Sequence, residues 1–397
     1  MKVLLAHNFY RSSAPSGEDA VYRNEKLMLE ENLDVVSFER YNDDIDDSTL
    51  FKKIKLALDG AWSVTTYNEL SQLIRDTQPD VAHFHNTFPQ ISPSAFAACQ
   101  DNGVPVVQTL HNYRFVCPNA LLQRGGRPCE DCLQGNLLPA LQHRCYRDSL
   151  MATSAQVWTI LSNRWRGTYN NKINRYIALT GFAADKLALG GLPKEKIEIK
   201  PNFLPNIPEP GKGDGGYAVY VGRLSEEKGL RTLIDAWTNL QFLPLKILGD
   251  GPLRSELQTK VKILGLPVEF LGYCNAEEIF RVVGSATLQV IPSEWYEPFG
   301  MVALEAYACG TPIVASRIGS LDEIVDEGKT GLKFEAGNAR NLADTVKLLI
   351  SDKAKLNKMR INARAEVKQK YSLDSNYQFL MKIYQNAITD FNNKSPV

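Results

Sequence analysis

The chain has no long apolar run and no net charge, and these two absences narrow its class. The apolar run near the N-terminus covers only Val3–Ala6, which is too short for the core of a signal peptide. No other run approaches the length of a membrane span. The 45 basic and 45 acidic residues balance, which disfavours nucleic acid as the main partner.

Cysteine is scarce and odd in number. Seven cysteines without an export signal favour a reducing compartment, so we expect a soluble cytoplasmic protein. Four of them lie in a loop-rich insertion, 117–145: Cys117, Cys129, Cys132 and Cys145. This insertion has one C-x2-C pair where zinc ribbons usually have two, so a closed zinc site and independent thiols both stay open.

The length of 397 residues is enough for about two or three domains. The stretch Lys200–Gly216 is dense in proline and glycine and is typical of a linker. Strands alternate with helices on both sides of it, which predicts an α/β protein with doubly wound sheets. We place a first domain at 1–203 and a second at 204–371, with the C-terminal helix segment 372–397 completing the first.

Polar residues follow three strands of the first half. The loop from His7 to Asp19 contains Gly17, which would let a ligand approach the backbone or simply form a turn. His83 and His85 alternate onto one face of a strand tip. His111 ends the strand that begins at Val104. It could contact or deprotonate an acceptor, donate to a leaving group, or be structural.

Two helical segments of the first half combine basic with large apolar residues. Phe51–Gly60 carries three lysines, and the long helical pattern Met151–Arg175 is rich in tryptophan and arginine. Both suit a surface of anionic lipid headgroups. Both equally suit ordinary surface helices with solvated cations.

Positive charge gathers after the first strand of the second half. In the motif GRLSEEKG, Arg223 leaves the strand and Lys228 opens the next helix. Two cations at the carboxyl end of a parallel strand can clamp a diphosphate. The next two strands end in turns that contain Gly249 and Tyr273, and these turns would frame a nucleoside.

The segment Ser293–Pro312 predicts a strand, a sharp entry and a helix. Backbone N–H groups at Gly300–Val302 would lack intrahelical acceptors and attract an anion. Glu297 precedes this helix, and Glu305 lies on the same helical face as its first residues. Carboxylates beside an anion site would hold something else, such as hydroxyls; the alternative is a capping glutamate and an ordinary helix glutamate.

These motifs together resemble the family 4 glycosyltransferases. GRLSEEKG, the GDGP turn at 249–252, and Glu297-x7-Glu305 within PSEWYEPFGMVALEAYACGTPIVAS carry the resemblance, which covers essentially the whole chain. It implies the GT-B fold, in which two Rossmann-like doubly wound domains face a central cleft and a C-terminal helix crosses back to the N-terminal domain. GEDAVYRNE and HFHNTFPQISPS resemble the branch that builds bacterial exopolysaccharide and lipopolysaccharide.

The resemblance implies a retaining hexosyl transfer from a nucleotide sugar. Arg223 and Lys228 would grip the diphosphate, while Glu297 would hold donor-sugar hydroxyls and Glu305 those of the ribose. We expect donor binding by Gly17, Arg223, Lys228, Gly249, Tyr273, Glu297, Phe299, Gly300, Met301, Val302 and Glu305, and catalytic roles for His111, Glu297, Arg223 and Lys228. The N-terminal loop has one glycine where many members have two, and Asn112 follows His111 where many have an acidic residue.

We expect UDP-glucose or another UDP-hexose as donor, GDP-mannose as the second candidate, and a saccharide or lipid-linked saccharide as acceptor. No cofactor or metal is expected, because the Arg223–Lys228 pair offsets the charge and the pair Asp44-x-Asp46 is typical of a helix-cap cluster. Peripheral contact with the cytoplasmic membrane face stays open. A sugar phosphorylase, a nucleotide-sugar epimerase and a non-catalytic carbohydrate-assembly protein are the rival interpretations.

Overall fold

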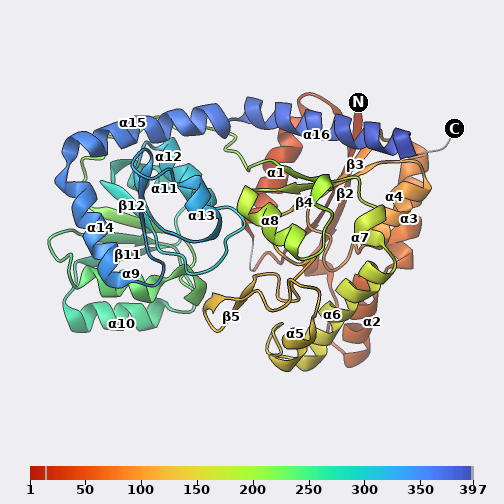
Figure 1. Ribbon diagram of the computed structural model, residues 1–397, viewed down its shortest axis with the longest axis horizontal. Coiled ribbons are helices and arrows are strands. Elements are labelled where there is room, and N and C mark those ends of the chain that lie inside the picture. Colours follow the sequence, from red (N-terminus) through yellow and green to blue (C-terminus); the bar gives the residue numbers. More distant parts are fainter. Residues whose placement is uncertain (14–15, 395–397) are drawn as a thin grey trace. The chain divides into compact units, whose positions relative to one another are not determined.

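The computed structural model describes residues 1–13 and 16–394 and contains two compact units (Figure 1). The N-terminal unit comprises Met1–Leu122, Cys129–Asn202 and Asn376–Val397, and the C-terminal unit comprises Gln123–Pro128 and Phe203–Ser375. Positions 14–15 of the expected first loop and 395–397 of the expected last segment lie outside the described residues. The domain boundaries expected from the sequence stay a prediction.

The N-terminal unit contains a six-stranded sheet in the order β2-β1-β3-β4-β7-β8, and every pair in it is parallel. Its strands are β1 (Lys2–Phe9), β2 (Asp34–Tyr41), β3 (Val81–Phe84), β4 (Val106–Leu110), β7 (Arg175–Ala178) and β8 (Ile197–Ile199). The helices of its chain segments are α1 (Gly17–Glu30), α2 (Leu50–Ala61), α3 (Val64–Thr77), α4 (Ser94–Asp101), α5 (Leu138–Gln142), α6 (Leu150–Trp165), α7 (Thr168–Asn171), α8 (Gly181–Leu189) and most of α16 (Leu373–Lys394), with 3-10 turns at Asn42–Asp44 and Lys194–Lys196.

The C-terminal unit contains a second parallel six-stranded sheet, in the order β11-β10-β9-β12-β13-β14. Its strands are β9 (Ala218–Val221), β10 (Leu245–Leu248), β11 (Val268–Gly272), β12 (Leu288–Ile291), β13 (Ile313–Ser316) and β14 (Gly331–Phe334). Its helices are α9 (Leu230–Trp237), α10 (Arg254–Leu264), α11 (Ala276–Ser285), α12 (Met301–Ala308), α13 (Gly319–Ile324), α14 (Ala339–Ser351) and α15 (Lys353–Lys370), with a 3-10 turn at Glu226–Lys228. The short strands β5 (Gln123–Arg124) and β6 (Arg127–Pro128) form an antiparallel pair.

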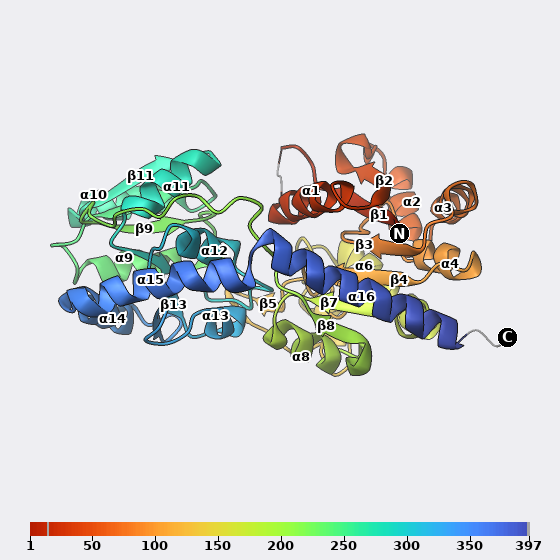
Figure 2. The same ribbon diagram turned by 90° about the horizontal axis from the view of Figure 1, so that it is seen from above.

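The central strands are buried on both faces, which explains why they are nearly continuous apolar runs. Every residue of β3, β4, β12 and β13 is buried. Helices lie on both sides of the strands in each unit (Figures 1 and 2). This is the doubly wound arrangement that the strand–helix alternation predicts.

The strand order fixes where each sheet can bind a ligand. In chain order, the C-terminal sheet runs 3-2-1-4-5-6, so its direction reverses between β9 and β12. The N-terminal sheet reverses between β1 and β3. Ligands of open α/β sheets bind beyond the carboxyl ends of the strands at such a point. Arg223, Glu297 and His111 all follow a strand that lies at or next to a reversal.

Two predicted elements were wrong in extent. The helix expected at 151–175 ends at Trp165, because Gly167 adopts the left-handed φ of +66° and a second short helix, α7, follows before β7 begins. The loop expected to start at His7 begins only after Phe9. Residues 7–9 pair with residues 39–41 of β2 and belong to β1. Among the described residues, no helix is long and apolar enough to cross a bilayer.

Candidate active site

The loops after β9 and β12 bring a lysine and a glutamate together in the C-terminal unit. Lys228, at the end of the β9–α9 loop, donates from its Nζ to Oε1 of Glu297 at 2.8 Å. Glu297 is buried and Lys228 is half-buried. Arg223 lies in the same loop as Lys228, and its side chain is exposed. This side chain has no hydrogen-bond or ion-pair partner among residues 1–13 and 16–394.

A glycine allows this approach of the two loops. Gly229 follows Lys228 directly and has φ of +69°, and a Cβ at this position would lie 1.9 Å from the carbonyl oxygen of Pro292. The backbone N–H of Glu294 donates to the carbonyl of Glu227 at 2.9 Å, which ties the loops together a few residues away. Backbone packing therefore holds Lys228 against Glu297.

The sequence interpretation left the carboxylate of Glu297 available for hydroxyls. In the structure one of its two oxygens already accepts hydrogen bonds, and the other has no donor among the described residues. Its Oε1 accepts from Lys228 and also from the hydroxyl of Ser293. Its Oε2 has no donor in the part of the chain that the structure describes. Lys228 also lies over the ring of Trp295, 5.4 Å from the centroid. The glutamate thus orients the lysine and still offers an acceptor for a hydroxyl.

The start of α12 offers unpaired backbone donors next to this pair. None of the N–H groups of Phe299–Val302 has an acceptor within the described residues, and the first bonded one, that of Ala303, donates to the carbonyl of Gly300 at 2.8 Å. The ring of Phe299 is buried and lies edge-on to Tyr371, 6.1 Å between centroids. Oriented N–H groups at a helix start attract anions. The anion site predicted at the start of α12, which includes Met301 and Val302, therefore has backbone N–H groups without an acceptor.

Glu305 lies one turn further along α12 and has a perturbed acidity. The side chain is half-buried, and loss of hydration raises its pKa to about 7. Among the described residues its carboxyl group has neither a cation nor a hydrogen-bond donor. A carboxyl group of this kind has its hydrogen-bonding capacity available for a ligand.

Gly249 and Tyr273 occupy the turns after β10 and β11, as predicted. The glycine matters for packing, and the tyrosine offers an exposed ring. Gly249 has φ of +128°, and a Cβ there would lie 2.0 Å from the carbonyl oxygen of Gly222. Its N–H donates to the carbonyl of Gly272 at 2.6 Å. The glycine is therefore required by the packing of neighbouring turns. Tyr273 is highly exposed, so its ring is available to stack on a ligand.

His111 of the N-terminal unit belongs to a buried network that the sequence did not reveal. Its Nε2 lies 2.9 Å from Nδ1 of His85, and Nε2 of His85 lies 3.1 Å from Oε1 of Glu25. The other oxygen of Glu25 accepts from Lys200 at 2.9 Å, and Lys200 also donates to Asn376 of α16. Four of the five residues in this chain of contacts are buried, and His111 is half-buried.

The charge at Glu25 fixes the hydrogen bond that His85 makes with it. Burial opposes ionisation of Glu25, but Lys200 and the histidines hold its pKa well below the ordinary value. His85 therefore donates from Nε2 to the carboxylate, and its Nδ1 forms a hydrogen bond with Nε2 of His111. Burial together with His85 and His7 lowers the pKa of His111, which stays neutral. Nδ1 of His111 is then the ring nitrogen that is left to contact a ligand.

Glu18 is a candidate that sequence reasoning missed. It lines a small pocket in the N-terminal unit together with His85, His111, Asn112 and other residues. Burial raises its pKa to about 7, and the hydroxyl of Tyr10 donates to it at 3.1 Å. The available signal was its position next to Gly17 in a loop that follows the carboxyl end of β1. Gly17 itself is exposed at the first position of α1, and a Cβ there would contact nothing.

Two family models match the chain one after the other. The model described as Glycosyltransferase Family 4 matches residues 34–205, and the model described as Glycosyl transferases group 1 matches residues 206–366. The chain belongs to the family 4 glycosyltransferases. Both sheets lie within the matched segments apart from β1, and the candidate residues lie within them apart from Gly17, Glu18 and Glu25 of α1 and Asn376 of α16.

Curated relatives agree with this assignment. An uncharacterized glycosyltransferase, MJ1607 of Methanocaldococcus jannaschii, is 36% identical over 48% of this chain and 50% of its own length. The present chain thus spans about half the length of that relative. Glycogen synthase of Mycobacterium tuberculosis is 30% identical over 70% of this chain and 62% of its own length.

Solved structures show the fold. Anabaena Alr3699/HepE, solved in complex with UDP, superposes with a TM-score of 0.68 at 19% identity, over 97% of this chain and 100% of that chain. Its complex with UDP-glucose gives 0.65 at 18% identity, over 97% and 99%. This similarity establishes the GT-B fold of the glycosyltransferase.

The described residues contain one group with metal-ligand spacing, formed by Glu25, His83 and His85. A cation is already present there, because Lys200 lies 2.9 Å from Glu25. Both ring nitrogens of His83 lie 2.8 Å from hydroxyls, those of Tyr384 and Thr109. The group is therefore built as a hydrogen-bonded ion pair.

Burial, and after it the nearby Cys117, Cys145 and Cys129, raise the pKa of Cys132 to about 11, so the four cysteines lie near one another and a zinc site and independent thiols both stay open. None of the seven cysteines forms a disulfide, and among the described residues no three thiols lie within 4.8 Å of one another. Asp46 accepts from the hydroxyl of Ser48 at 2.7 Å and pairs with Lys52. This arrangement fits the predicted helix-cap cluster better than a metal site.

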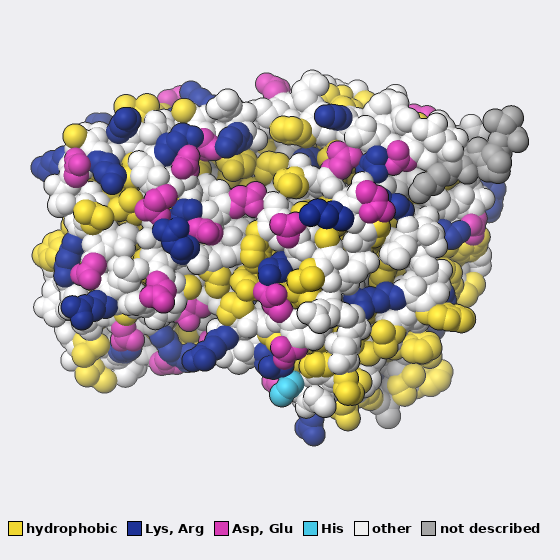
Figure 3. All heavy atoms as spheres, viewed as in Figure 1, with side chains coloured by type: hydrophobic (Ala, Val, Ile, Leu, Met, Phe, Trp, Pro, Cys, Tyr) yellow, Lys and Arg dark blue, Asp and Glu magenta, His cyan; other side chains and the backbone are white. Residues whose placement is uncertain are grey.

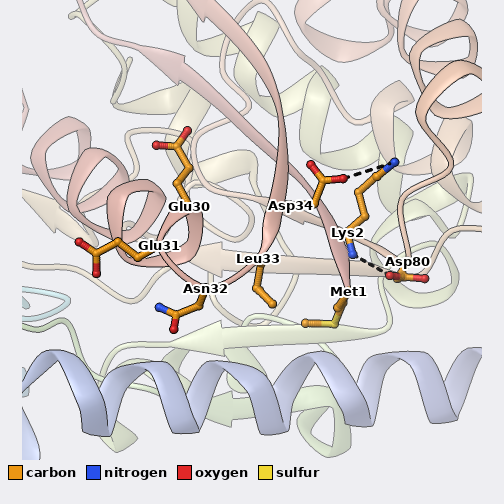
Figure 4. A pocket seen from close by; sticks show the side chains of 8 residues that line it. All are labelled: Met1, Lys2, Glu30, Glu31, Asn32, Leu33, Asp34 and Asp80. Atoms are coloured by element: carbon orange, nitrogen blue, oxygen red, sulfur yellow. Dashed lines mark hydrogen bonds and ion pairs between the residues drawn. The ribbon is translucent and has the colours of Figure 1, made fainter.

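An open depression also lies at the opposite edge of the N-terminal sheet, where the strands begin (Figure 4). The backbone N–H of Lys2 donates to Asp80 at 2.7 Å, and its side chain lies 3.5 Å from Asp34. These residues start or precede strands, so the depression is on the edge that α/β sheets do not use for ligands.

Proposed function

We propose that this glycosyltransferase transfers a hexose from a UDP-sugar to a saccharide or a lipid-linked saccharide, with retention of anomeric configuration. UDP-glucose is the first candidate donor. The observation that carries the proposal is the Lys228–Glu297 pair beside the free N–H groups at the start of α12. A cation, oriented dipoles and a hydroxyl acceptor together match the diphosphate and the sugar of one nucleotide sugar.

In the C-terminal unit, each candidate residue is assigned to one part of the donor. Arg223 and Lys228 bind the diphosphate and offset the charge that develops on it, and the N–H groups of 299–302 bind the same anion. Oε2 of Glu297 accepts from donor-sugar hydroxyls. Glu305 accepts from ribose hydroxyls, and the turns at Gly249 and Tyr273 flank the nucleoside.

The N-terminal unit is assigned to the acceptor. His111 forms a hydrogen bond with a substrate hydroxyl through Nδ1, and Glu18 contacts a second hydroxyl in the same pocket. We propose from the resemblance alone that Gly17 contacts the donor phosphates, because a Cβ at this position would meet no atom within 4 Å.

The chemistry follows from these assignments. The bond between the anomeric carbon and the phosphate oxygen breaks, and the acceptor oxygen bonds to that carbon on the same face. The departing phosphate takes the acceptor proton. Fixed cations at Arg223 and Lys228 can stabilise this leaving group, so we propose that no added metal is required.

Support for the uridine donor comes from relatives of the same fold. Anabaena Alr3699/HepE was solved with UDP and with UDP-glucose. GDP-mannose remains the second candidate. Action in the cytoplasm is part of the proposal, since the sequence has an odd number of cysteines, seven. So are a place in exopolysaccharide or lipopolysaccharide assembly and peripheral contact with a membrane.

A screen of nucleotide sugars tests the proposal with the full chain. Thermal stabilisation identifies bound donors, and product analysis with saccharide acceptors identifies transfer. We expect UDP-glucose or another UDP-hexose to stabilise the protein and to yield an α-linked product and UDP. A changed sugar still attached to nucleotide would indicate an epimerase, and no binding of any nucleotide sugar would indicate a non-catalytic protein.

A further inference from the structure

A buried ion pair of the N-terminal unit stands outside the substrate contacts of the proposed function. Oε2 of Glu25 in α1 lies 2.9 Å from Nζ of Lys200, which follows β8, and each side chain is 1% exposed. In Figure 3, by contrast, charged side chains of both signs lie scattered over the visible surface, where water solvates them. Removing two charges from water is costly, and their mutual attraction often only balances that cost. Burial of this pair therefore points to a use besides stability.

The pair continues through two histidines to the pocket that Glu18 and His111 line. Oε1 of Glu25 lies 3.1 Å from Nε2 of His85, and Nδ1 of His85 lies 2.9 Å from Nε2 of His111. The two imidazole rings are stacked, with 21° between their planes and 5.1 Å between their centroids. Glu25 and His85 are buried, whereas His111 is half-buried. These contacts lead from a buried charge to the candidate acceptor pocket.

A histidine that takes part in such contacts is held in one orientation. When an imidazole ring is neutral, the hydrogen bond made by one of its nitrogens decides the role of the other. Both nitrogens of His85 are engaged, by Glu25 and by His111, so its ring cannot turn over without breaking both contacts. Burial lowers the pKa of His111 and keeps its ring neutral. The contact of its Nε2 with His85 therefore leaves Nδ1 one fixed role toward a ligand.

Lys200 keeps the carboxylate of Glu25 charged and in place. Its Nζ also donates to the side-chain oxygen of Asn376 in α16 at 2.9 Å. The amide nitrogen of Asn376 donates in turn to the carbonyl of Pro201 at 2.7 Å, so the ammonium group has fixed partners in α1 and α16. Without this ammonium group, burial would favour the protonated form of Glu25. A protonated carboxyl group would no longer hold His85 as its hydrogen-bond donor.

We propose that Glu25, Lys200 and His85 are positioning residues, which hold the ring of His111 in the orientation and the tautomer that a substrate hydroxyl requires. Glu25 and Lys200 are buried away from the pocket and act through His85. The proposal deepens the role of His111 in the proposed function and rests on it. A fixed hydrogen-bonding group needs no reorganisation when the substrate binds, and this lowers the barrier to transfer.

His83 provides a matched branch of the same buried group. It lies 3.3 Å from Oε1 of Glu25, and its two ring nitrogens lie 2.8 Å from the hydroxyls of Thr109 and Tyr384. Within the described part of the chain, His83 has no hydrogen bond or ring contact with His111. Tyr384→Phe therefore disturbs the buried group through His83 and leaves the contacts that lead to His111 in place. If the group were purely structural, this variant would lower transfer as well.

Spectra of the full chain labelled with ¹⁵N-histidine test the proposal without any substrate. The sequence has five histidines, and the signals lost in His111→Gln identify His111. A protonated and an unprotonated ring nitrogen differ in chemical shift, so a fixed tautomer gives well-separated shifts and exchange between tautomers draws them together. We expect separated shifts in the wild type and in Tyr384→Phe, and shifts drawn together in Glu25→Gln/Lys200→Met. Wild-type shifts of His111 in that double variant would overturn the proposal.

Transfer from UDP-glucose to a saccharide acceptor supplies the second measurement. The double variant Glu25→Gln/Lys200→Met removes both charges, so no unpaired charge stays buried. At saturating UDP-glucose, this variant and His85→Gln should each lower kcat by about 10–100-fold. The KM for UDP-glucose should stay unchanged, because the residues assigned to the donor lie in the C-terminal unit. Tyr384→Phe should transfer like the wild type.

The outcomes separate the positioning role from the proposed function. A wild-type kcat in both Glu25→Gln/Lys200→Met and His85→Gln would overturn the positioning role, as would an equal loss of kcat in Tyr384→Phe. A wild type that transfers no sugar would contradict the proposed function, whereas the spectra of His111 would still test the positioning.

Discussion

Lys228 lies 2.8 Å from Glu297, although 69 positions separate them in the sequence. They come from loops after β9 and β12, the two strands between which the C-terminal sheet reverses. The pair neutralises a carboxylate that would otherwise repel a diphosphate at the start of α12. It also holds the ammonium group in one place, which reduces the ordering cost when an anion binds.

Loss of the cations should abolish transfer while the fold persists. Lys228→Met and Arg223→Ala should each lower kcat by about 100-fold or more, because each removes charge that stabilises the leaving diphosphate. Steady-state kinetics at saturating donor measure the effect. Wild-type rates in both variants would contradict the clamp assignment.

Two controls separate charge from folding in this experiment. Lys262→Ala removes an exposed lysine of α10 and should leave the rate unchanged. Lys228→Met leaves Glu297 buried without its cation, so it should also lower stability. The double variant Lys228→Met/Glu297→Gln should regain stability but not activity.

Donor binding should depend on pH through Glu305. Its pKa is raised to about 7, and ribose hydroxyls donate best to the ionised carboxylate. The dissociation constant for the donor should therefore fall as pH rises through about 7. Calorimetric titration between pH 5.5 and 8.5 measures it, and Glu305→Gln should remove this dependence.

The raised pKa of Glu305 also predicts that the free energy of unfolding falls as pH rises, whereas donor binding becomes stronger. A carboxyl group with a raised folded-state pKa costs stability once pH exceeds its unfolded value of about 4.3, and the full cost is reached above about 7. Glu305→Gln should therefore raise the free energy of unfolding at pH 8 by about 1–3 kcal/mol and have little effect at pH 4. A loss of stability at pH 8 would show that Glu305 has a partner that stabilises its charge.

Much of the fold could be predicted from the sequence because its signals are local. Apolar runs predicted the strands of the two parallel sheets, while the linker expected at 200–216 stays a prediction. Two local predictions were wrong where tertiary contacts compete with pattern. β2 prolongs β1 through 7–9, and Gly167 interrupts a helical pattern that continues beyond it.

The candidate site was only partly predictable, because side-chain partners come from distant positions. Arg223, Lys228 and Glu297 were found from motifs, but the Lys228–Glu297 bond depends on the approach of Gly229 to Pro292. The network from His111 to Lys200 joins residues that directly follow β3, β4 and β8 with Glu25 of α1. No spacing rule predicts such a network, since the sheet order and the packing of α1 bring its members together.

Lys200 should be essential for the stability of the N-terminal unit. It is buried and is the cation that pairs with Glu25 at 2.9 Å. Lys200→Met leaves that carboxylate uncompensated and should cost about 3–5 kcal/mol. Denaturant unfolding measures the loss, and Lys200→Met/Glu25→Gln should recover part of it. Lys196→Met is a less suitable control, because that lysine is also buried; exposed Lys194→Met should be neutral.

The low pKa of Glu25 gives this pair a pH signature. Its stabilising contribution is present above the unfolded value of about 4.3 and is lost as pH falls through the depressed folded value. The contribution of the pair should therefore persist below pH 4, while the lowered pKa values of His7, His83 and His111 make the protein less stable as pH falls below about 6.5. Lys200→Met should unfold at a higher pH than the wild type, and identical acid transitions in the two proteins would exclude the role assigned to the pair.

Transfer should persist when metals are removed. Arg223 and Lys228 supply fixed positive charge where a divalent cation would otherwise act on a diphosphate. The rate in 5 mM EDTA, a concentration on the order of that used to strip divalent ions, should equal the rate without it. Strict dependence on added magnesium or manganese would overturn this part of the proposal.

Glu18 should affect the acceptor and not the donor. Its pKa of about 7 makes it largely ionised at pH 8, where it can accept from an acceptor hydroxyl beside His111. At saturating donor, kcat/KM for the acceptor should rise with pH through about 7. Glu18→Gln should lower it about 10–100-fold and flatten that profile, while donor affinity stays unchanged. Exposed Glu31→Gln, at the far end of α1, is the matched control and should behave as wild type. An equal effect of Glu18→Gln on donor affinity would instead place Glu18 on the donor side, and a wild-type profile in Glu18→Gln would remove it from the reaction.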